Sequence, residues 1–271
     1  MSAPTTPAVT LPSPVPNHRT GKIRLLLHDM RFGLITAGRT PFPLLIALFF
    51  PLFFNVMFNL LQSGETVGGT AAVQSTTAAI IVFIITAAGY FNMATGIVIA
   101  REKGVLKRVR QTPMPKVLHM GSRIGGSVLL SGASIVIMLA VSLLAFGLEL
   151  RPAALPSLVI VFLLGSVASC AMGLAVTRLI PSVEAALMVS TATLFPLLFV
   201  SGVFFPLPLP GPVQTVVDLL PFAPMVEATR TALDPAATGL ALDLPSLAII
   251  AVWGAAAILA ALKTMPWEPQ N

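Results

Sequence analysis

The sequence predicts an all-α integral membrane protein with six transmembrane helices, and three observations lead to this fold class. Of the 271 residues, 56% are hydrophobic and only 10% are charged, whereas a soluble domain carries about 25% charged residues. The apolar residues are gathered in uninterrupted windows, each long enough to cross a bilayer as a helix. These windows lack the period-2 alternation of barrel strands, and backbone in lipid must satisfy its own hydrogen bonds, so helices are expected.

Each predicted span is a window that contains no Asp, Glu, Lys, Arg or His, because a charge at the centre of a spanning helix costs roughly 2.5–3.5 kcal/mol. Six windows meet this condition, at residues 41–61, 71–100, 124–148, 153–177, 185–205 and 244–262. The fourth is dense in small residues, which predicts close helix packing. Pro196 lies in the fifth and is a candidate kink in a gating helix.

The part of the chain before the first window divides into two segments. Residues 1–20 are rich in proline and lack the apolar run of a signal peptide, so they are expected to form a disordered tail. Residues 21–37 carry an apolar stripe at helical spacing, opposite Arg24, His28 and Arg31. This pattern predicts an amphipathic helix at the membrane interface. Whether it is only an anchor or also contacts another protein stays open.

Lys and Arg are distributed unevenly between the two sides that six spans would create. Fourteen of these cations fall on the side of the two termini, and two, Arg151 and Arg230, fall on the other. The positive-inside rule therefore predicts that both termini are cytoplasmic. We expect a multi-pass protein of the cell membrane whose transmembrane domain covers residues 21–265.

The segment between the second and third windows, 101–123, reads REKGVLKRVRQTPMPKVLHMGSR. Its first residues extend the second helix, Gly104 weakens that helix, and the prolines of Thr112-Pro113-Met114-Pro115 break it. The pattern predicts a short basic helix with a sharp turn, suited to carrying force between a soluble partner and the bilayer. A loop that only sets topology is the alternative.

The segment 206–243 is long, apolar and rich in proline, so it is not expected to lie free in solvent. We expect short helices that dip into the outer leaflet or cap the bundle, because irregular backbone at that depth must be buried or wet. Glu227 and Arg230 are spaced i, i+3 and are expected to pair on one such helix. A contact of this pair with a substrate is the alternative role.

Asn55, Asn59 and Asn92 are polar residues inside the predicted spans. They are expected either to hydrogen-bond a neighbouring helix or to contact cargo. No Asp, Glu, Lys, Arg or His lies inside any window, which disfavours an ion-coupled carrier. An uncharged pathway instead suits hydrophobic or amphiphilic cargo.

Several other classes of protein are disfavoured by the same sequence. Cys170 is the single cysteine, so neither an internal disulfide nor a multi-thiolate metal site is possible. The three histidines are scattered, which leaves no catalytic cluster and argues against an enzyme. The net charge of +6 is spread between apolar windows, so it indicates membrane topology and not nucleic acid. No G-x-x-x-x-G-K-[S/T] phosphate-binding loop occurs anywhere in the chain.

Three places in this layout resemble the membrane subunits of ABC-2 type exporters of the daunorubicin-resistance kind. One is Arg101-Glu102-Lys103-Gly104, followed by Leu106-Lys107-Arg108 and Thr112-Pro113. A second is Ser201-Gly202-Val203-Phe204-Phe205-Pro206 at the end of the fifth window. The third is Leu220-Pro221 with Glu227 and Arg230, ahead of the sixth. Their order relative to the six windows also resembles the family, over roughly residues 20–265.

The resemblance implies a permease subunit that pairs with a second copy of itself or a homologous permease. Each subunit would dock a cytoplasmic ATP-binding subunit, and this chain would bind no cofactor, since ATP and Mg²⁺ would sit on that partner. Contact with the ATPase would come from Arg101, Glu102, Lys103, Gly104, Leu106, Lys107, Arg108, Thr112 and Pro113. The candidate pathway and gate residues are Asn55, Asn59, Asn92, Pro196, Phe204, Phe205, Pro206, Glu227 and Arg230. Membrane lipids are further expected partners.

The implied activity is efflux of a drug, antibiotic or lipid, and the export direction follows from the resemblance alone. A secondary carrier or channel without an ATPase partner is the alternative function. A membrane-embedded enzyme or assembly scaffold is a third.

Overall fold

The computed structural model describes residues 41–62, 66–67, 70–102, 116–204 and 210–264, and almost all of them are helical. The helices are α2 (Pro41–Leu61), α3 (Ala72–Thr86), the π-helix η1 (Ala87–Phe91), α4 (Asn92–Glu102), α6 (Lys116–Phe146), α7 (Ala154–Val176), the 3₁₀ helix η2 (Thr177–Leu179), α8 (Val183–Val200), α9 (Gly211–Asp218), α10 (Phe222–Leu233) and α11 (Leu244–Thr264). Two short strands, β1 (Thr66–Val67) and β2 (Thr70–Ala71), pair antiparallel. The predicted tail at 1–20 and the interfacial helix at 21–37 lie outside the described residues.

Five helical stretches are long and apolar enough to cross a membrane among the described residues. They are Ala72–Glu102, Ile124–Phe146, Ala154–Leu179, Val183–Val200 and Leu244–Ala261. The protein is therefore an all-α integral membrane protein. At the first predicted window, α2 is 21 residues long, about 31 Å at 1.5 Å per residue, but the apolar stretch identified within it is shorter, Leu48–Leu61. The sixth span, at α2, stays a prediction.

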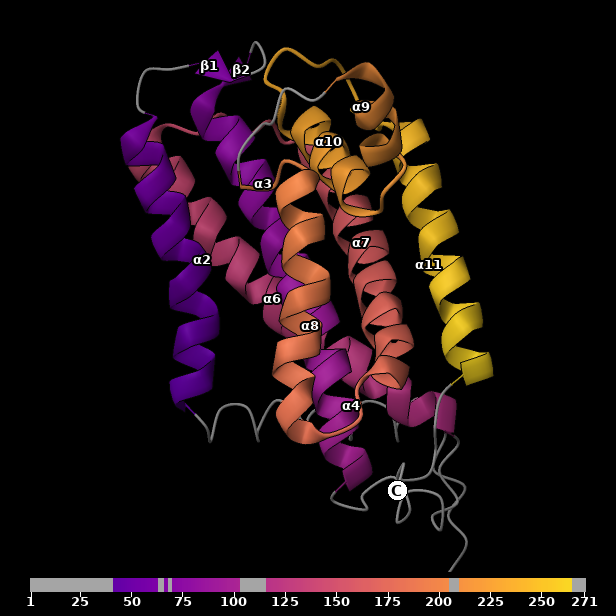
Figure 1. The fold of residues 1–271 in the computed structure, drawn as a ribbon. Coiled ribbons are helices and arrows are strands. Elements are labelled where there is room, and N and C mark those ends of the chain that lie inside the picture. The colour runs from indigo at the N-terminus through magenta and orange to yellow at the C-terminus, as the bar shows by residue number, and fades with distance from the viewer. Residues whose placement is uncertain (1–40, 63–65, 68–69, 103–115, 205–209, 265–271) are drawn as a thin grey trace, which may run out of the picture.

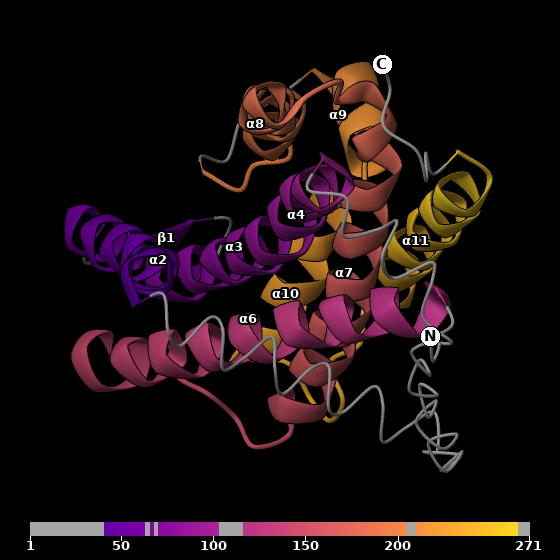
Figure 2. The same cartoon turned by 90° about the horizontal axis from the view of Figure 1, so that it is seen from below.

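The long helices alternate in direction (Figure 1). Helices α2, α6 and α8 run one way, and α3 to α4, α7 and α11 run back. One end of the bundle, here called the basic end, carries Arg101 and Arg178. The other, here called the capped end, carries the β1–β2 hairpin, α9 and α10. Seen from the basic end, α7 lies among the other helices (Figure 2), and it packs against α3, η1, α4, α6, α10 and α11.

Small side chains on α7 allow its neighbours to approach closely. A Cβ atom built on Gly173 would lie 2.5 Å from the carbonyl oxygen of Tyr90, so η1 touches α7 backbone to backbone. On another side, a Cβ on Gly254 of α11 would lie 3.3 Å from the Cβ of Ala168. The close packing predicted from the small residues of the fourth window is confirmed.

The second window is not the single regular helix that its apolar sequence predicts. The π-helix η1 interrupts it between α3 and α4. A Cβ on Gly89 would lie 2.8 Å from the Cβ of Ser169, so the wider turn sits against α7 at a point of close contact. Such π-turns are rare and occur frequently at functional sites.

The fifth helix ends earlier than residue 205, the end of its charge-free window. Helix α8 stops at Val200, and Gly202 has a φ of +71°. The amide of Gly202 donates to the carbonyl of Phe199 and the amide of Val203 to that of Leu198, at 3.2 Å each. This is a Schellman cap, for which glycine in the left-handed region is favoured. Hydropathy cannot reveal it, because the residues beyond the cap are also apolar.

The long segment after α8 covers the capped end with short helices, as its composition predicts. Most of α10 is buried, including Phe222, Met225 and Leu233, and it packs against α3, α7 and α11. Helix α9 is more exposed, and Val216 and Leu219 present apolar side chains outward. The indole N–H of Trp253 on α11 donates to the carbonyl of Leu219 at 2.7 Å, which ties α9 to the bundle.

Candidate functional site

Arg101, predicted to contact an ATPase, is buried at the basic end, with only 3% of its surface exposed. It occupies the last turn of α4. Its Nη2 donates to the carbonyl oxygens of Ile180 at 2.9 Å and Pro181 at 3.0 Å. These two carbonyls belong to the turn that joins α7 and η2 to α8. Arg101 is therefore bound to another part of its own chain.

Glu102, the next residue, binds the other end of the same turn, where α8 begins. Its Oε1 accepts the amide N–H of Val183, the first residue of α8, at 2.8 Å. The hydroxyl of Ser182 caps α8 by accepting the amide of Ala185 at 3.2 Å. An acid at a helix N-terminus is stabilised by the unpaired N–H groups there. The other predicted ATPase contacts, Lys103, Gly104, Leu106, Lys107, Arg108, Thr112 and Pro113, lie outside the described residues.

Asn55 and Asn59 are buried between helices and bond to protein groups. The Nδ2 of Asn55 donates to the hydroxyl of Ser142 on α6 at 2.9 Å, and Thr77 of α3 donates to the same hydroxyl at 3.3 Å. The Nδ2 of Asn59 donates to the backbone carbonyl of Asn55 at 2.8 Å. Of the two predicted roles, the bond to α6 supports helix pairing for Asn55, whereas the hydrogen bonds of Asn59 lie within α2.

The other polar and proline candidates occupy different environments. Asn92, the first residue of α4, is exposed at the bundle surface. Pro196 lies inside α8 and cannot donate to the carbonyl one turn earlier. Phe204 is half-buried just beyond the α8 cap. Phe205 and Pro206 lie outside the described residues.

Aromatic side chains form a continuous series across three helices, here called the aromatic row. It consists of Phe49, Phe50, Phe53 and Phe54 of α2, Phe83 of α3, Phe195 and Phe199 of α8, and Phe204. Ring centroids are 6.1 Å apart for Phe50 and Phe83, 5.6 Å for Phe83 and Phe204, and 4.7 Å for Phe204 and Phe199. Phe49, Phe50, Phe53 and Phe199 are exposed, so the row presents apolar area on one face of the chain.

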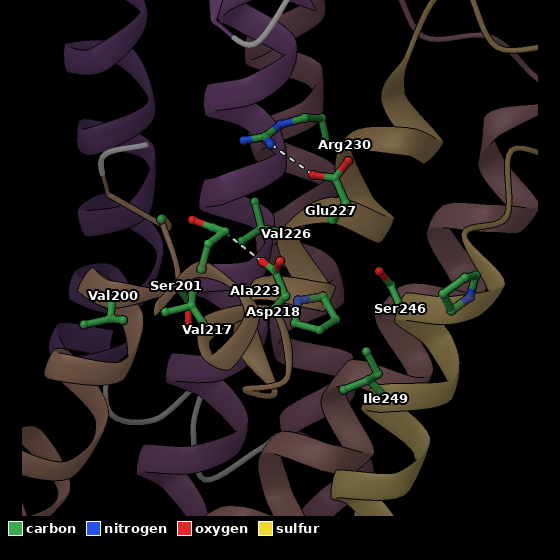
Figure 3. Close-up of a pocket in the computed structure, with 14 residues that line it drawn as sticks. Val200, Ser201, Val217, Asp218, Ala223, Val226, Glu227, Arg230, Ser246 and Ile249 are labelled. Atoms are coloured by element: carbon green, nitrogen blue, oxygen red, sulfur yellow. Dashed lines mark hydrogen bonds and ion pairs between the residues drawn. The ribbon is translucent and has the colours of Figure 1, made fainter. Parts of the chain in front are cut away.

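A cavity of about 400 Å³ opens at the capped end between the end of α8, α9, α10 and the start of α11 (Figure 3). Val200, Val217 and Ile249 contribute apolar walls. Glu227 and Arg230 line the same cavity, and their side chains pair at 3.1 Å. The i, i+3 pair predicted from the sequence is therefore present, and it faces a cavity.

The polar lining of this cavity carries one net negative charge. Asp218 and Glu227 contribute two carboxylates, and Arg230 offsets one of them. The Nε2 of Gln214 donates to Oδ1 of Asp218 at 2.7 Å. Ser201 is buried, and its hydroxyl has no hydrogen-bond partner among the described residues. The cavity thus combines apolar walls with charged and polar lining groups.

Sequence reasoning also missed a contact deeper along the second and fifth spans. The hydroxyls of Tyr90 in η1 and Thr193 in α8 lie 2.7 Å apart. Each belongs to an apolar window, and nothing in the local pattern singles it out. Gly89, immediately before the only tyrosine of the chain, was the available signal of close packing there.

Comparison with known proteins identifies a family. The family model described as ABC-2 family transporter protein matches residues 53–263, which is most of the chain. No curated protein matches. Over the described part of the chain, no cluster of three or more His, Cys, Asp or Glu residues is placed to hold a metal ion.

Proposed function

The chain belongs to the ABC-2 family of transporter proteins, and on this premise we propose that it forms the export pathway for a hydrophobic or amphiphilic cargo, driven by a separate ATP-binding subunit. As a member of that family it is a membrane permease of an ABC transporter, a transport subunit and not itself the catalytic one. The cargo class, the direction of transport and the identity of the ATPase are the parts we propose.

The observation that carries the cargo class is the aromatic row. A pathway for apolar molecules needs apolar walls that are accessible from the lumen or the lipid, and cargo sites are predominantly lined by hydrophobic and aromatic side chains. Phe49, Phe50 and Phe53 are 64%, 44% and 49% exposed in the single chain. Aromatic rings bury large areas and stack on planar or aliphatic ligands. We propose that a second copy, or a homologous permease, faces this row and completes the pathway.

An external energy source is proposed because the chain carries no phosphate-binding loop and no charge in its predicted spans. ATP and Mg²⁺ would then be bound by the partner subunit and not by this chain. We further propose that this partner lies in the cytoplasm at the basic end, that both termini face it, and that the host membrane is the plasma membrane. The distribution of Lys and Arg supports that orientation.

The experiment is transport by a purified complex. The tagged chain is isolated from its native membrane, the ATP-binding protein that accompanies it is identified, and both are reconstituted in liposomes. Accumulation of a fluorescent amphiphilic dye is followed with and without ATP. We expect uptake into vesicles whose ATPase faces outward, and no uptake when the ATPase is omitted.

A matched pair of variants tests the aromatic row. Phe50→Ala removes an exposed ring that contacts Phe83, whereas Leu144→Ala removes an apolar side chain from α6 that is 88% exposed and lies outside the row. We expect a several-fold loss of dye transport for Phe50→Ala only. Equal transport by both variants would show that the aromatic row does not line the pathway. Uptake by the chain alone, driven by an ion gradient, would establish the secondary carrier instead.

A further inference from the structure

Helix α8 depends on the second span for its position near the basic end. Among the described elements it packs chiefly against α4 and η1. The contact is a buried apolar cluster of Ala94 and Val98 from α4, Ile180 from the turn before α8, and Ala186 from α8. Arg101 and Glu102 lie at the end of α4, next to this cluster. The second and fifth spans are therefore joined by both apolar and polar contacts.

The polar contacts match the dipoles of the two helices that meet at the turn. Arg101 donates to the carbonyls of Ile180 and Pro181, which follow the C-terminal end of α7 and η2. Glu102 accepts from the amide at the N-terminal end of α8. Helix C-termini attract cations and N-termini attract anions. Two adjacent residues of opposite charge thus hold both sides of one turn.

Burial makes the arginine contact obligatory. Arg101 is 3% exposed as a residue, so its guanidinium has little access to water, and a buried charge without partners is strongly unfavourable. Within the described chain, its Nε and Nη1 have no hydrogen-bond partner, so the two bonds to the turn are the ones that retain it. Hydrogen bonds to charged groups are also the stronger class. Separation of α4 from the turn would break both of these hydrogen bonds and leave the buried guanidinium without a partner in the described part of the chain.

We infer that Arg101 and Glu102 form a clamp that makes the end of the second span and the start of the fifth span move as one body. This inference rests on the proposed function, in which the ATPase lies at the basic end, and on the family resemblance, which implies that the ATPase contacts the residues that follow Glu102. Displacement of α4 is then passed to α8 through the α7–α8 turn. Arg101 and Glu102 act as positioning residues for transport, within the chain, in place of the direct ATPase contact expected from the sequence.

The test compares distances in the reconstituted complex, with the ATPase that co-purifies. Cys170 is replaced by alanine, and spin labels are placed at Leu259 of α11 paired with either Ile99 of α4 or Glu184 of α8. We expect ATP to change both distances together in the otherwise unmodified chain. In the double variant Arg101→Gln/Glu102→Gln, the Ile99 distance should still respond and the Glu184 distance should not. Transport should fall at least fivefold while ATP hydrolysis continues.

A matched control uses Arg178→Gln, which changes an exposed arginine in η2 just before the same turn and should leave both distances and transport unchanged. A disulfide between engineered cysteines at Val98 and Ile180 should restore transport to the clamp variant if the clamp acts as a mechanical tie. A Glu184 distance that follows ATP as before in the clamp variant, or one that never moves in the parent chain during transport, would overturn the inference. Absence of ATP-driven transport in the parent complex would instead refute the proposed function, and the clamp with it.

Discussion

Substitution of Gly173 by alanine tests a backbone contact between α7 and η1 that leaves no room for a Cβ atom. A Cβ atom there would lie 2.5 Å from the carbonyl oxygen and 2.9 Å from the Cα of Tyr90. Both are backbone atoms of η1, so no side-chain rotation relieves the clash. To reach the ordinary contact distance of 3.4 Å from the present 2.5 Å, α7 and η1 must separate locally by about 0.9 Å.

The size of the effect follows from two opposing terms. Overpacking of a close contact costs about 1–3 kcal/mol. A radial gap of 0.5–1 Å also forfeits about a quarter to a half of the dispersion energy of each atom pair between α7 and η1. Alanine recovers up to about 1 kcal/mol through its higher helix propensity. The gain in helix propensity is shared by any Gly→Ala change inside a helix, so Gly126→Ala, where open space surrounds the Cβ position, is the control that isolates the clash.

The free energy of unfolding can be measured by titrating a strong anionic detergent into mixed micelles. We expect Gly173→Ala to be less stable than Gly126→Ala by about 1–3 kcal/mol, with Gly254→Ala, whose nearest neighbour is a side-chain atom at 3.3 Å, between them. If Gly173→Ala unfolds at the same detergent fraction as Gly126→Ala, the backbone contact between η1 and α7 is not as described, and the reasoning fails.

Three further predictions concern buried or tethering groups. Ser142→Ala removes the acceptor for Asn55 and Thr77 and should lower the free energy of unfolding by about 0.5–2 kcal/mol. Ser134→Ala is the control, because the Ser134 hydroxyl bonds a carbonyl of its own helix, and it should lower that free energy less. Equal losses in the detergent titration would contradict the interhelical role of Ser142. Cys170 is fully buried, so a membrane-permeant maleimide should add mass only as the bundle unfolds, and rapid labelling of the folded protein would refute its placement. Trp253→Phe removes the donor to Leu219 and should speed amide hydrogen exchange across 211–219, measured by mass spectrometry, while exchange in α7 stays constant; unchanged exchange in 211–219 would show that this hydrogen bond does not hold α9.

The membrane fold could be predicted from the sequence because its main physical term is local. Exclusion of charge from hydrocarbon acts residue by residue, so the windows alone located the helices of five spans to within a few residues at most ends. The close packing of α7 could also be predicted, because small residues such as Gly173 and Ala168 let neighbouring helices approach closely. The i, i+3 pair of Glu227 and Arg230 follows from helical geometry in the same way.

The candidate site was predicted less completely. The sequence singles out Arg101 and Glu102 as candidate ATPase contacts, but their partners in the structure lie about 80 residues further along the chain, at Ile180 and Val183. A charge pattern cannot say whether a cation faces a second protein or its own backbone. Asn55 posed the same difficulty, because its role depends on Ser142, 87 residues away.

What the sequence alone determined, therefore, is which segments form the long apolar helices and which of their faces can approach closely, since both depend on the transfer energy and size of individual side chains. Only the tertiary structure decided the π-turn at η1, the early end of α8, the aromatic row and the burial of Arg101. Each of these depends on hydrogen bonds and contacts between atoms far apart in the chain, and their energy exists only once the helices are assembled.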